Sequence, residues 1–256
     1  MSQPTKAAII TGASRGVGRA TAIALARQGY AVAVNYSASK DEAENVVQQI
    51  EGYGGAAIAV QANVSENTAC KALVAQTIEA FGRIDVLVNN AGVTSFIPHN
   101  ALDQVRDEDW DRILGVNLIG PFQMVRAAMP ALSASGNGAI VNVASIAGLS
   151  ALGSSIPYCA SKAALLNMTV ALARVCAPKV RVNAVAPGFI EGEWLKQGLG
   201  PAYEMVKKQC QDRAPLHKVC TPEDVAGAIL SLVTGSPMIT GQTVVVDGGM
   251  LIGSVP

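Results

Sequence analysis

The alternation of short apolar runs with longer helical patterns constrains the fold of this chain most. Runs of Val, Ile and Ala recur throughout, and stretches with helical periodicity separate them. This rhythm predicts βαβ units, and because the runs are apolar on both faces we expect helices on both sides of a parallel sheet. We expect strands at 6–11, 31–36, 56–61, 84–89, 139–144, 180–185 and 243–246, and helices near 17–28, 41–51, 66–81, 107–132, 158–175 and 222–234.

The predicted fold class is a doubly wound (Rossmann) α/β fold with a seven-stranded parallel sheet. At 256 residues the chain is longer than most domains, but an α/β unit of this length commonly folds around one sheet, so we expect a single domain over 1–256. The segment 189–215 departs from the pattern and follows a strand. Because ligands bind at the carboxyl ends of strands, it is predicted to be a substrate lid, whose Trp194, Leu195 and Leu199 indicate an apolar pocket.

Charge and composition argue against several classes of partner. Lys+Arg and Asp+Glu number 19 each and form no basic run, so nucleic acid is not an expected partner. The N-terminus lacks the layout of a signal peptide, and no uninterrupted apolar run approaches the ~18 residues of a membrane span, so we expect a cytoplasmic protein. The five cysteines form no Cys-x-x-Cys pair and there are two histidines, so no metal site is expected.

Three glycines mark the turn that follows the first expected strand. Gly12 permits a sharp turn, Gly16 lets the backbone approach a pyrophosphate, and Gly18 lets the next helix pack closely on the strand. The start of that helix directs unpaired N–H groups and positive partial charge at the phosphates. A plain glycine-rich turn is the alternative, and the position between first strand and first helix favours dinucleotide binding.

Tyr158, Lys162 and Ser145 form the candidate catalytic group. Tyr158 and Lys162 are four residues apart in a helical pattern and therefore share one face, while Ser145 follows a strand at the expected ligand edge. A nearby ammonium is expected to lower the pKa of the phenol by about 3 units from about 10. Tyr158 would then exchange the proton and Ser145 would bond the substrate oxygen. The alternative is an ordinary amphipathic helix.

Pro121 falls inside the expected helix 107–132. A proline there leaves the carbonyl of Asn117 without its helical donor, and that oxygen could hold a water relaying protons from Lys162. A packing kink flanked by Gly115 and Gly120 is an equally good interpretation.

Together these motifs, with Asn89-Asn90-Ala91-Gly92 and Pro187-Gly188, resemble those of the short-chain dehydrogenase/reductases. The resemblance spans practically the whole chain and is greatest to the subgroup containing 3-oxoacyl-carrier-protein reductases, whose C-terminal strand Val246-Asp247-Gly248-Gly249 matches. It implies a catalytic tetrad of Asn117, Ser145, Tyr158 and Lys162, and a homotetramer with the helices 107–132 and 158–175 at an interface. The residues expected to contact the cofactor are Gly12, Ser14, Arg15, Gly16, Val17, Gly18, Asn35, Tyr36, Ser37, Asn63, Val64, Asn90, Ala91, Gly92, Tyr158, Lys162, Pro187, Gly188 and Ile190.

The end of the second expected strand favours NADP(H) over NAD(H). NAD-preferring sites place an acid there for the ribose 2′-hydroxyl, but this strand ends in the neutral Asn35-Tyr36-Ser37. Arg15 resembles the family's arginine for the 2′-phosphate, with Ser37 or Lys40 as further donors. A solvated loop charge is the alternative for Arg15.

Three departures from the family pattern bear on function. Asn63 replaces the usual Asp, although its carbonyl could still accept a bond from the adenine amino group, and Gly192 replaces a Thr in the lid. Pro130 stands where carrier-protein reductases present an Arg, although Arg174 matches a second docking position, so docking of a carrier protein is not expected.

The expected function is NADPH-dependent reduction of a ketone or 3-oxoacyl-type carbonyl to a secondary alcohol. The alternative within the same class is an NAD(P)-dependent dehydrogenase that oxidises a sugar, polyol or secondary alcohol, since it needs the same residues. A non-catalytic dinucleotide-binding regulator is a third interpretation, which predicts damage to the tetrad, and the sequence has none.

Overall fold

A parallel seven-stranded sheet forms the centre of the computed structural model, which describes residues 6–253. The order across the sheet is β3-β2-β1-β4-β5-β6-β7. The predicted Rossmann-type fold is confirmed, and each strand lies within two residues of its expected bounds. The strands are β1 (Lys6–Ile10), β2 (Tyr30–Tyr36), β3 (Ala57–Gln61), β4 (Val86–Asn89), β5 (Gly138–Val143), β6 (Val180–Pro187) and β7 (Thr243–Val246).

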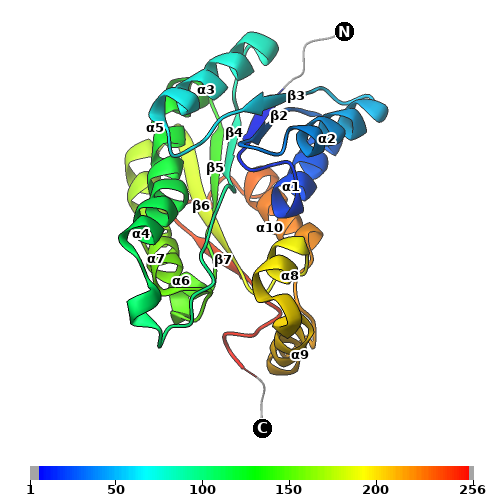
Figure 1. Cartoon of the computed structure of the whole chain (residues 1–256). Helices are drawn as coiled ribbons and strands as arrows, with labels where there is room; N and C mark the ends of the chain where they lie inside the picture. Colours follow the sequence, from blue (N-terminus) through cyan, green and yellow to red (C-terminus); the bar gives the residue numbers. More distant parts are fainter. Residues whose placement is uncertain (1–5, 254–256) are drawn as a thin grey trace.

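Helices cover both faces of the sheet, as Figure 1 shows. On one side lie α1 (Gly16–Arg27), α2 (Lys40–Gly52) and α10 (Pro222–Thr234). On the other lie α3 (Asn67–Phe81), α5 (Gly120–Ala134) and α7 (Ile156–Cys176). Two hydrophobic cores result, because successive residues of a strand face opposite ways: Ala8 and Ile10 of β1 pack in one core, Ala7 and Ile9 in the other.

The expected helix 107–132 is present, but a π-helical turn interrupts its α-helical hydrogen bonding. It divides into α4 (Asp107–Leu114), a π-helical turn (Gly115–Ile119) and α5. Pro121 has no N–H to donate, so the chain begins a new helix around it, where a proline in the first turn needs no donor. The Gly120 N–H instead reaches the Gly115 carbonyl, the longer spacing of a π turn.

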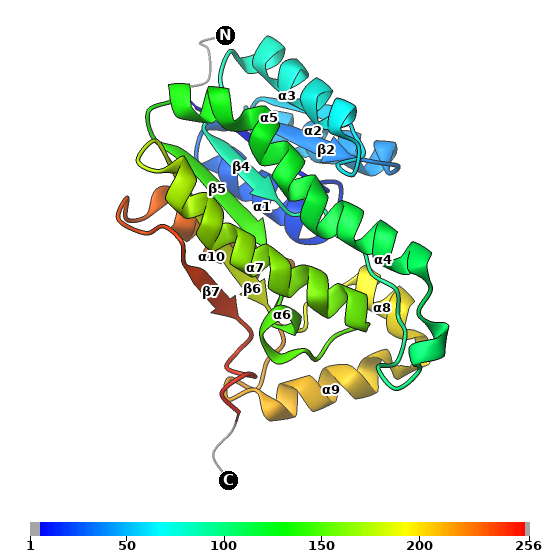
Figure 2. The same cartoon turned by 90° about the vertical axis from the view of Figure 1, so that its left-hand side faces the viewer.

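The segment 189–215 is more regular than the sequence suggested. It contains α8 (Glu193–Leu199), a 3₁₀ turn (Gly200–Ala202) and α9 (Tyr203–Arg213). Figure 2 shows α8 and α9 beyond the carboxyl ends of the strands, close to α6 (Ala147–Ser150) and the start of α7. The ion pair between Lys207 and Glu191, with N and O 2.7 Å apart, ties α9 to the chain leaving β6.

Within residues 6–253 one helix, α7, is long and apolar enough by length and composition to cross a membrane. In the structure 44% of its most apolar window is buried. It packs along β5 and β6, with Leu172 in one of the two cores and Leu165 and Leu166 in a smaller buried cluster beside β6, which is the position of a core helix.

Candidate active site

The ends of β1 and β4 are joined by hydrogen bonds at the edge where ligands bind in such folds. The Thr11 hydroxyl accepts bonds from the backbone N–H groups of Asn90, at 2.9 Å, and Ala91, at 3.0 Å. Asn90 Nδ2 in turn donates to the carbonyls of Thr11 and Gly12. The order β2-β1-β4 makes this the point where the winding of the sheet reverses, so a crevice is expected here.

The glycine turn has the conformation that a phosphate-binding loop needs. Gly12 and Gly16 have φ of +60° and +55°, which side chains disfavour. A Cβ on Gly18 would lie 2.3 Å from the Gly12 carbonyl oxygen, so helix and turn could not pack as they do. A Cβ on Gly16 would meet no protein atom, because this residue faces open space. The turn therefore fits a dinucleotide pyrophosphate at the start of α1, with Ser14 buried and Val17 in the core beside it.

Asn35 holds this turn in place. Its Oδ1 accepts from the Gly12 N–H at 3.1 Å, while Nδ2 donates to the carbonyls of Tyr36, Val60 and Ala62. All the polar atoms of a buried side chain are thus used inside the protein. Its place among the expected cofactor contacts stays a prediction, and the structure points to a positioning role.

Several polar or basic side chains are exposed around the end of β2 and the glycine turn. Tyr36 is buried, whereas Ser37, Lys40 and Arg15 are exposed. Arg15 precedes α1, and within residues 6–253 its side chain makes no capping bond to that helix. A guanidinium left in solvent beside a phosphate-binding turn is available to an anion.

Asn63 does not offer the acceptor that the sequence suggested. Its Oδ1 already accepts from the backbone N–H and the hydroxyl of Ser65, at 3.2 and 2.8 Å, and its Nδ2 donates to Glu66. The side chain closes the turn that leads into α3, while Val64 is buried against Gly120.

Tyr158, Lys162 and Ser145 come together at the ends of α7 and β5. Ser155 caps α7 by accepting the Tyr158 N–H at 3.4 Å, which places the phenol in the first turn. Lys162, one turn later and buried, donates to the carbonyl of Val143 at 2.8 Å, and its Nζ lies 5.7 Å from the centre of the Tyr158 ring. The Ser145 hydroxyl accepts from the Ala147 N–H at 3.1 Å.

The pKa of Tyr158 is shifted opposite to the expected direction. Burial raises it to about 12, and the hydrogen bond with Ser145 opposes that rise. Burial also lowers the pKa of Lys162 to about 8. The expected net lowering of the phenol's pKa is wrong for this arrangement, because desolvation of the phenol outweighs the effect of an ammonium that is itself desolvated and directed at a strand carbonyl.

Asn117 lies in the π-helical turn and is fully buried. Its Oδ1 accepts the Val93 N–H at 2.8 Å, and its Nδ2 donates to the Val93 carbonyl and to Ser161 on α7. A Cβ on Gly92 would lie 3.6 Å from both Asn117 Oδ1 and Lys162 Nζ, so these two residues converge on one point. The tetrad implied by the resemblance is therefore brought together.

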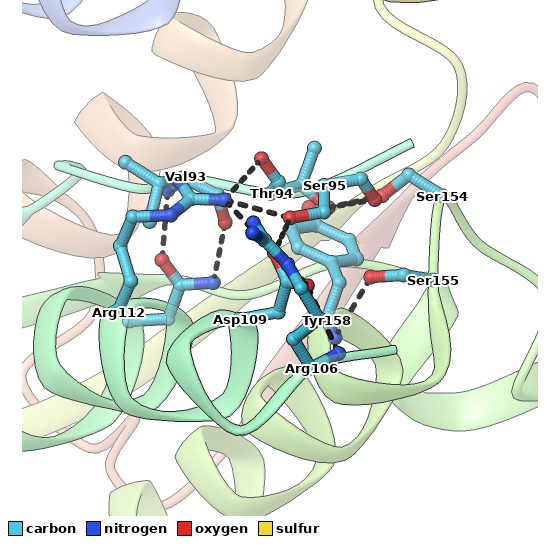
Figure 3. Close-up of polar contacts among 10 residues, drawn as sticks. Val93, Thr94, Ser95, Arg106, Asp109, Arg112, Ser154, Ser155 and Tyr158 are labelled. Atoms are coloured by element: carbon cyan, nitrogen blue, oxygen red, sulfur yellow. Dashed lines mark hydrogen bonds and ion pairs between the residues drawn. The ribbon is translucent and has the colours of Figure 1, made fainter. Parts of the chain in front are cut away.

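Sequence reasoning missed a polar network beside the tetrad, drawn in Figure 3. Asp109 on α4 is buried and accepts from the Ser95 hydroxyl, which lowers the pKa of the carboxyl. Arg112 donates to Ser95 Oγ at 2.7 Å and to the Thr94 carbonyl at 3.1 Å. The Thr94 and Ser154 hydroxyls are 2.6 Å apart. Thr94, Ser95 and Ser154 lie on irregular segments, where periodicity gives no signal.

The chain after β6 completes the site. Gly188 donates to the Val246 carbonyl at 2.8 Å, and a Cβ there would lie 2.8 Å from Asp247 Cβ, so Pro187 and Gly188 are pressed against the end of β7. Ile190 pairs with Cys220 in an isolated bridge before the chain enters α8. The backbone at the base of the lid is thereby fixed.

Comparisons with known proteins agree with this geometry. A family profile described as enoyl-(acyl carrier protein) reductase matches residues 12–251. A protein of Streptomyces violaceoruber, described as ketoacyl reductase 2 of the granaticin polyketide synthase, is 44% identical over 242 residues, 94% of each chain. A solved structure from Burkholderia xenovorans, described as a short-chain dehydrogenase/reductase, superposes with a TM-score of 0.90 at 37% identity, covering 99% of this chain and 100% of the other. The chain belongs to the short-chain dehydrogenase/reductase family.

Membership of the short-chain dehydrogenase/reductase family makes the protein an NAD(P)-dependent oxidoreductase. The 3-oxoacyl-[acyl-carrier-protein] reductase FabG of Staphylococcus aureus is 39% identical over 248 residues, 96% of this chain and 98% of the other. At the level of the family, the activity is that of a ketoacyl reductase.

Proposed function

We propose that the protein reduces a ketone or 3-oxoacyl-type carbonyl to a secondary alcohol with NADPH, and that Tyr158 is its general acid. The observation that carries the proposal is the convergence of Tyr158, Ser145 and Lys162 at the carboxyl edge of the sheet, beside the glycine turn. A high pKa keeps the phenol protonated at neutral pH, which suits proton donation.

The residues would act in the following way. NADPH, when bound, supplies a hydride to the carbonyl carbon. Ser145 donates a hydrogen bond to the carbonyl oxygen, and Tyr158 donates its phenolic proton to the same oxygen as negative charge develops there. Lys162 places positive charge near the phenol and stabilises the phenolate that remains. Asn117 positions Val93 and α7 through its side-chain bonds.

For the cofactor, the proposed contacts are the glycine turn for the pyrophosphate, Arg15 and Ser37 for the 2′-phosphate, and Val64 and Asn90 to Gly92 for the adenosine. Pro187, Gly188 and Ile190 are the proposed contacts of the nicotinamide. The absence of a carboxylate at the end of β2 supports NADPH over NADH, since an acid there would repel the 2′-phosphate.

Tyr158→Phe tests the proposal. It removes the proton donor and keeps the ring, so kcat for ketone reduction should fall at least ~100-fold while the Kd of NADPH stays nearly unchanged. Steady-state kinetics and cofactor titration measure the two quantities. Tyr53→Phe, an exposed tyrosine after α2, is the matched control. Wild-type turnover by Tyr158→Phe would refute the assignment.

We propose a cytoplasmic homotetramer. An apolar surface on α5 and α7 includes Phe122, 44% exposed, and Val175, 76% exposed. A second lies on the edge strand β7, where Val244 and Val245 are partly exposed. Two separate apolar surfaces suit a tetramer with two kinds of two-fold interface. Light scattering should give dimers for Val175→Glu, whereas a monomeric wild type would contradict the assembly.

A further inference from the structure

Phe96 stands where the lid helix α8 meets the segment that follows β4. The rings of Phe96 and Trp194 pack edge to face with their centroids 6.2 Å apart, and the ring of Trp194 lies 6.4 Å from that of Tyr158. Centroid separations of this size mean direct contact between rings. Two side chains distant in the sequence therefore meet beside the proposed acid.

Gly198, one turn beyond Trp194 on α8, packs directly on the ring of Phe96. A Cβ at this position would lie 1.9 Å from Phe96 Cζ and 2.0 Å from Phe96 Cε2. Atoms do not approach so closely, so any other residue would displace the ring or the helix. Glycine destabilises a helix, and this contact gives a reason for its presence near the end of α8.

Phe96 is fixed by bonds on both sides of it. Ser95 is held by Asp109 and by Arg112, and the Ile97 N–H donates to the Ser154 carbonyl at 2.9 Å. Figure 3 shows Ser95, Asp109 and Arg112 beside Tyr158. The backbone on either side of Phe96 is therefore held in place by hydrogen bonds. Helix α8 packs against the ring that this backbone carries.

We propose that Phe96 determines substrate specificity, by setting how closely α8 and Trp194 approach Tyr158. With α8 against Phe96, the contact between Trp194 and Tyr158 leaves no space for a further ring between them. The substituent on this side of the carbonyl must then be slender and unbranched, such as a methyl group or the chain of a 3-oxoacyl compound. A ketone with an aryl group on one side and a branched group on the other requires α8 to move away. This inference rests on the carbonyl reductase function proposed above.

The kinetic test compares two ketones, ethyl acetoacetate and isobutyrophenone, with NADPH as reductant. Phe96→Ala should raise kcat/KM for isobutyrophenone relative to ethyl acetoacetate at least ~10-fold, since pocket contacts of this size discriminate by 10- to 200-fold. Gly198→Ala should raise KM for ethyl acetoacetate about 10-fold by displacing Phe96 or α8. The double variant removes the clash, so its KM should return to within about 3-fold of that of Phe96→Ala.

Gly227→Ala on α10 is the matched control for the new methyl group. A Cβ at Gly227 would meet no atom within 4 Å, and this glycine is also helical. Its kinetics should equal those of the wild type. Phe96→Leu serves where Phe96→Ala does not fold, and it should move the ratio in the same direction.

A fluorescence experiment tests the closing contact without turnover. The chain has two tryptophans, so Trp110→Phe leaves Trp194 as the sole reporter. In this background Phe96→Ala and Gly198→Ala should each increase the quenching of Trp194 by acrylamide at least about 2-fold, whereas Gly227→Ala should not.

The two proposals fail in different ways. If the wild type reduces neither ketone, the proposed function is in error, and the fluorescence result alone decides the contact between Phe96 and α8. If the wild type reduces ethyl acetoacetate but the ratio is unchanged in Phe96→Ala, Phe96 does not set specificity. Unchanged quenching in both variants would overturn the closing contact itself.

Discussion

Lys162 Nζ donates to the Val143 carbonyl at 2.8 Å and lies 5.7 Å from the centre of the Tyr158 ring. The last residue of β5 thus holds the ammonium of Lys162. Lys162 itself lies one helical turn beyond the proposed acid on α7. Because burial lowers the pKa of Lys162 to about 8 and raises that of Tyr158 to about 12, the two groups titrate in separate pH ranges.

This separation predicts the pH dependence of reduction. As pH rises through about 8, Lys162 loses its charge while Tyr158 stays protonated, so kcat/KM should fall above about pH 8. In Lys162→Arg the guanidinium remains charged, so any residual activity should lack this alkaline limb. Steady-state rates at saturating NADPH across the pH range measure both profiles. A wild-type decline centred at about pH 10 would show that the limb does not come from a Lys162 with a lowered pKa.

Pro121→Ala tests the π-helical turn. Restoring an N–H at position 121 lets α4 and α5 join in one regular helix, which would shift Asn117 away from Val93 and Ser161. We expect kcat to fall about 3- to 10-fold while the free energy of unfolding stays within about 1 kcal/mol of wild type. Turnover and urea denaturation measure the two. A more stable, fully active variant would refute both the positioning role and a proton relay at the Asn117 carbonyl.

The repeating elements of the fold could be predicted because they depend on periodicity. Strands buried on both faces read as apolar runs, and the glycine turn combines local spacing with position in the chain. Tyr158 and Lys162 were also within reach, since four residues place two side chains on one helical face.

The remaining features depend on contacts between distant segments. Nothing local in the sequence pairs Phe96 with Gly198 or Ser95 with Asp109, because such pairs form only once the sheet brings their segments together. The pKa of Tyr158 was predicted in the wrong direction for a related reason. Spacing along a helix gives the neighbour, whereas burial and the partner of Lys162 come from tertiary structure.

Asn35→Ala should show that this side chain supports the glycine turn. It leaves the Gly12 N–H without its acceptor and removes the side-chain donor from three buried carbonyls, which should lower the free energy of unfolding by about 2–4 kcal/mol. Because the turn loses its anchor, the Kd of NADPH should also rise about 10-fold. Urea denaturation and cofactor titration measure these, with exposed Asn45→Ala as control. An unchanged Kd in a destabilised variant would mean that Asn35 stabilises the protein but does not position the glycine turn for the cofactor.

Cofactor preference is the prediction that depends most on single residues. A contact between a guanidinium and a phosphate contributes about 1.5–3 kcal/mol, or ~10- to 150-fold in affinity. With exposed Arg15 beside the turn and no acid at the end of β2, NADPH should exceed NADH in kcat/KM at least ~10-fold.

Arg15→Ala should remove most of that difference by raising KM for NADPH alone. Combining it with Tyr36→Asp places a carboxylate where a 2′-hydroxyl would be accepted and a 2′-phosphate repelled, so the preference should narrow further or reverse. Arg27→Ala changes an exposed arginine in the last turn of the same helix, away from the phosphate-binding end, and should leave the preference as it is. Kinetics with both cofactors at one ketone concentration provide the comparison. Equal use of NADPH and NADH by the wild type would mean that Arg15 is a solvated charge and that the end of β2 does not select the 2′-phosphate.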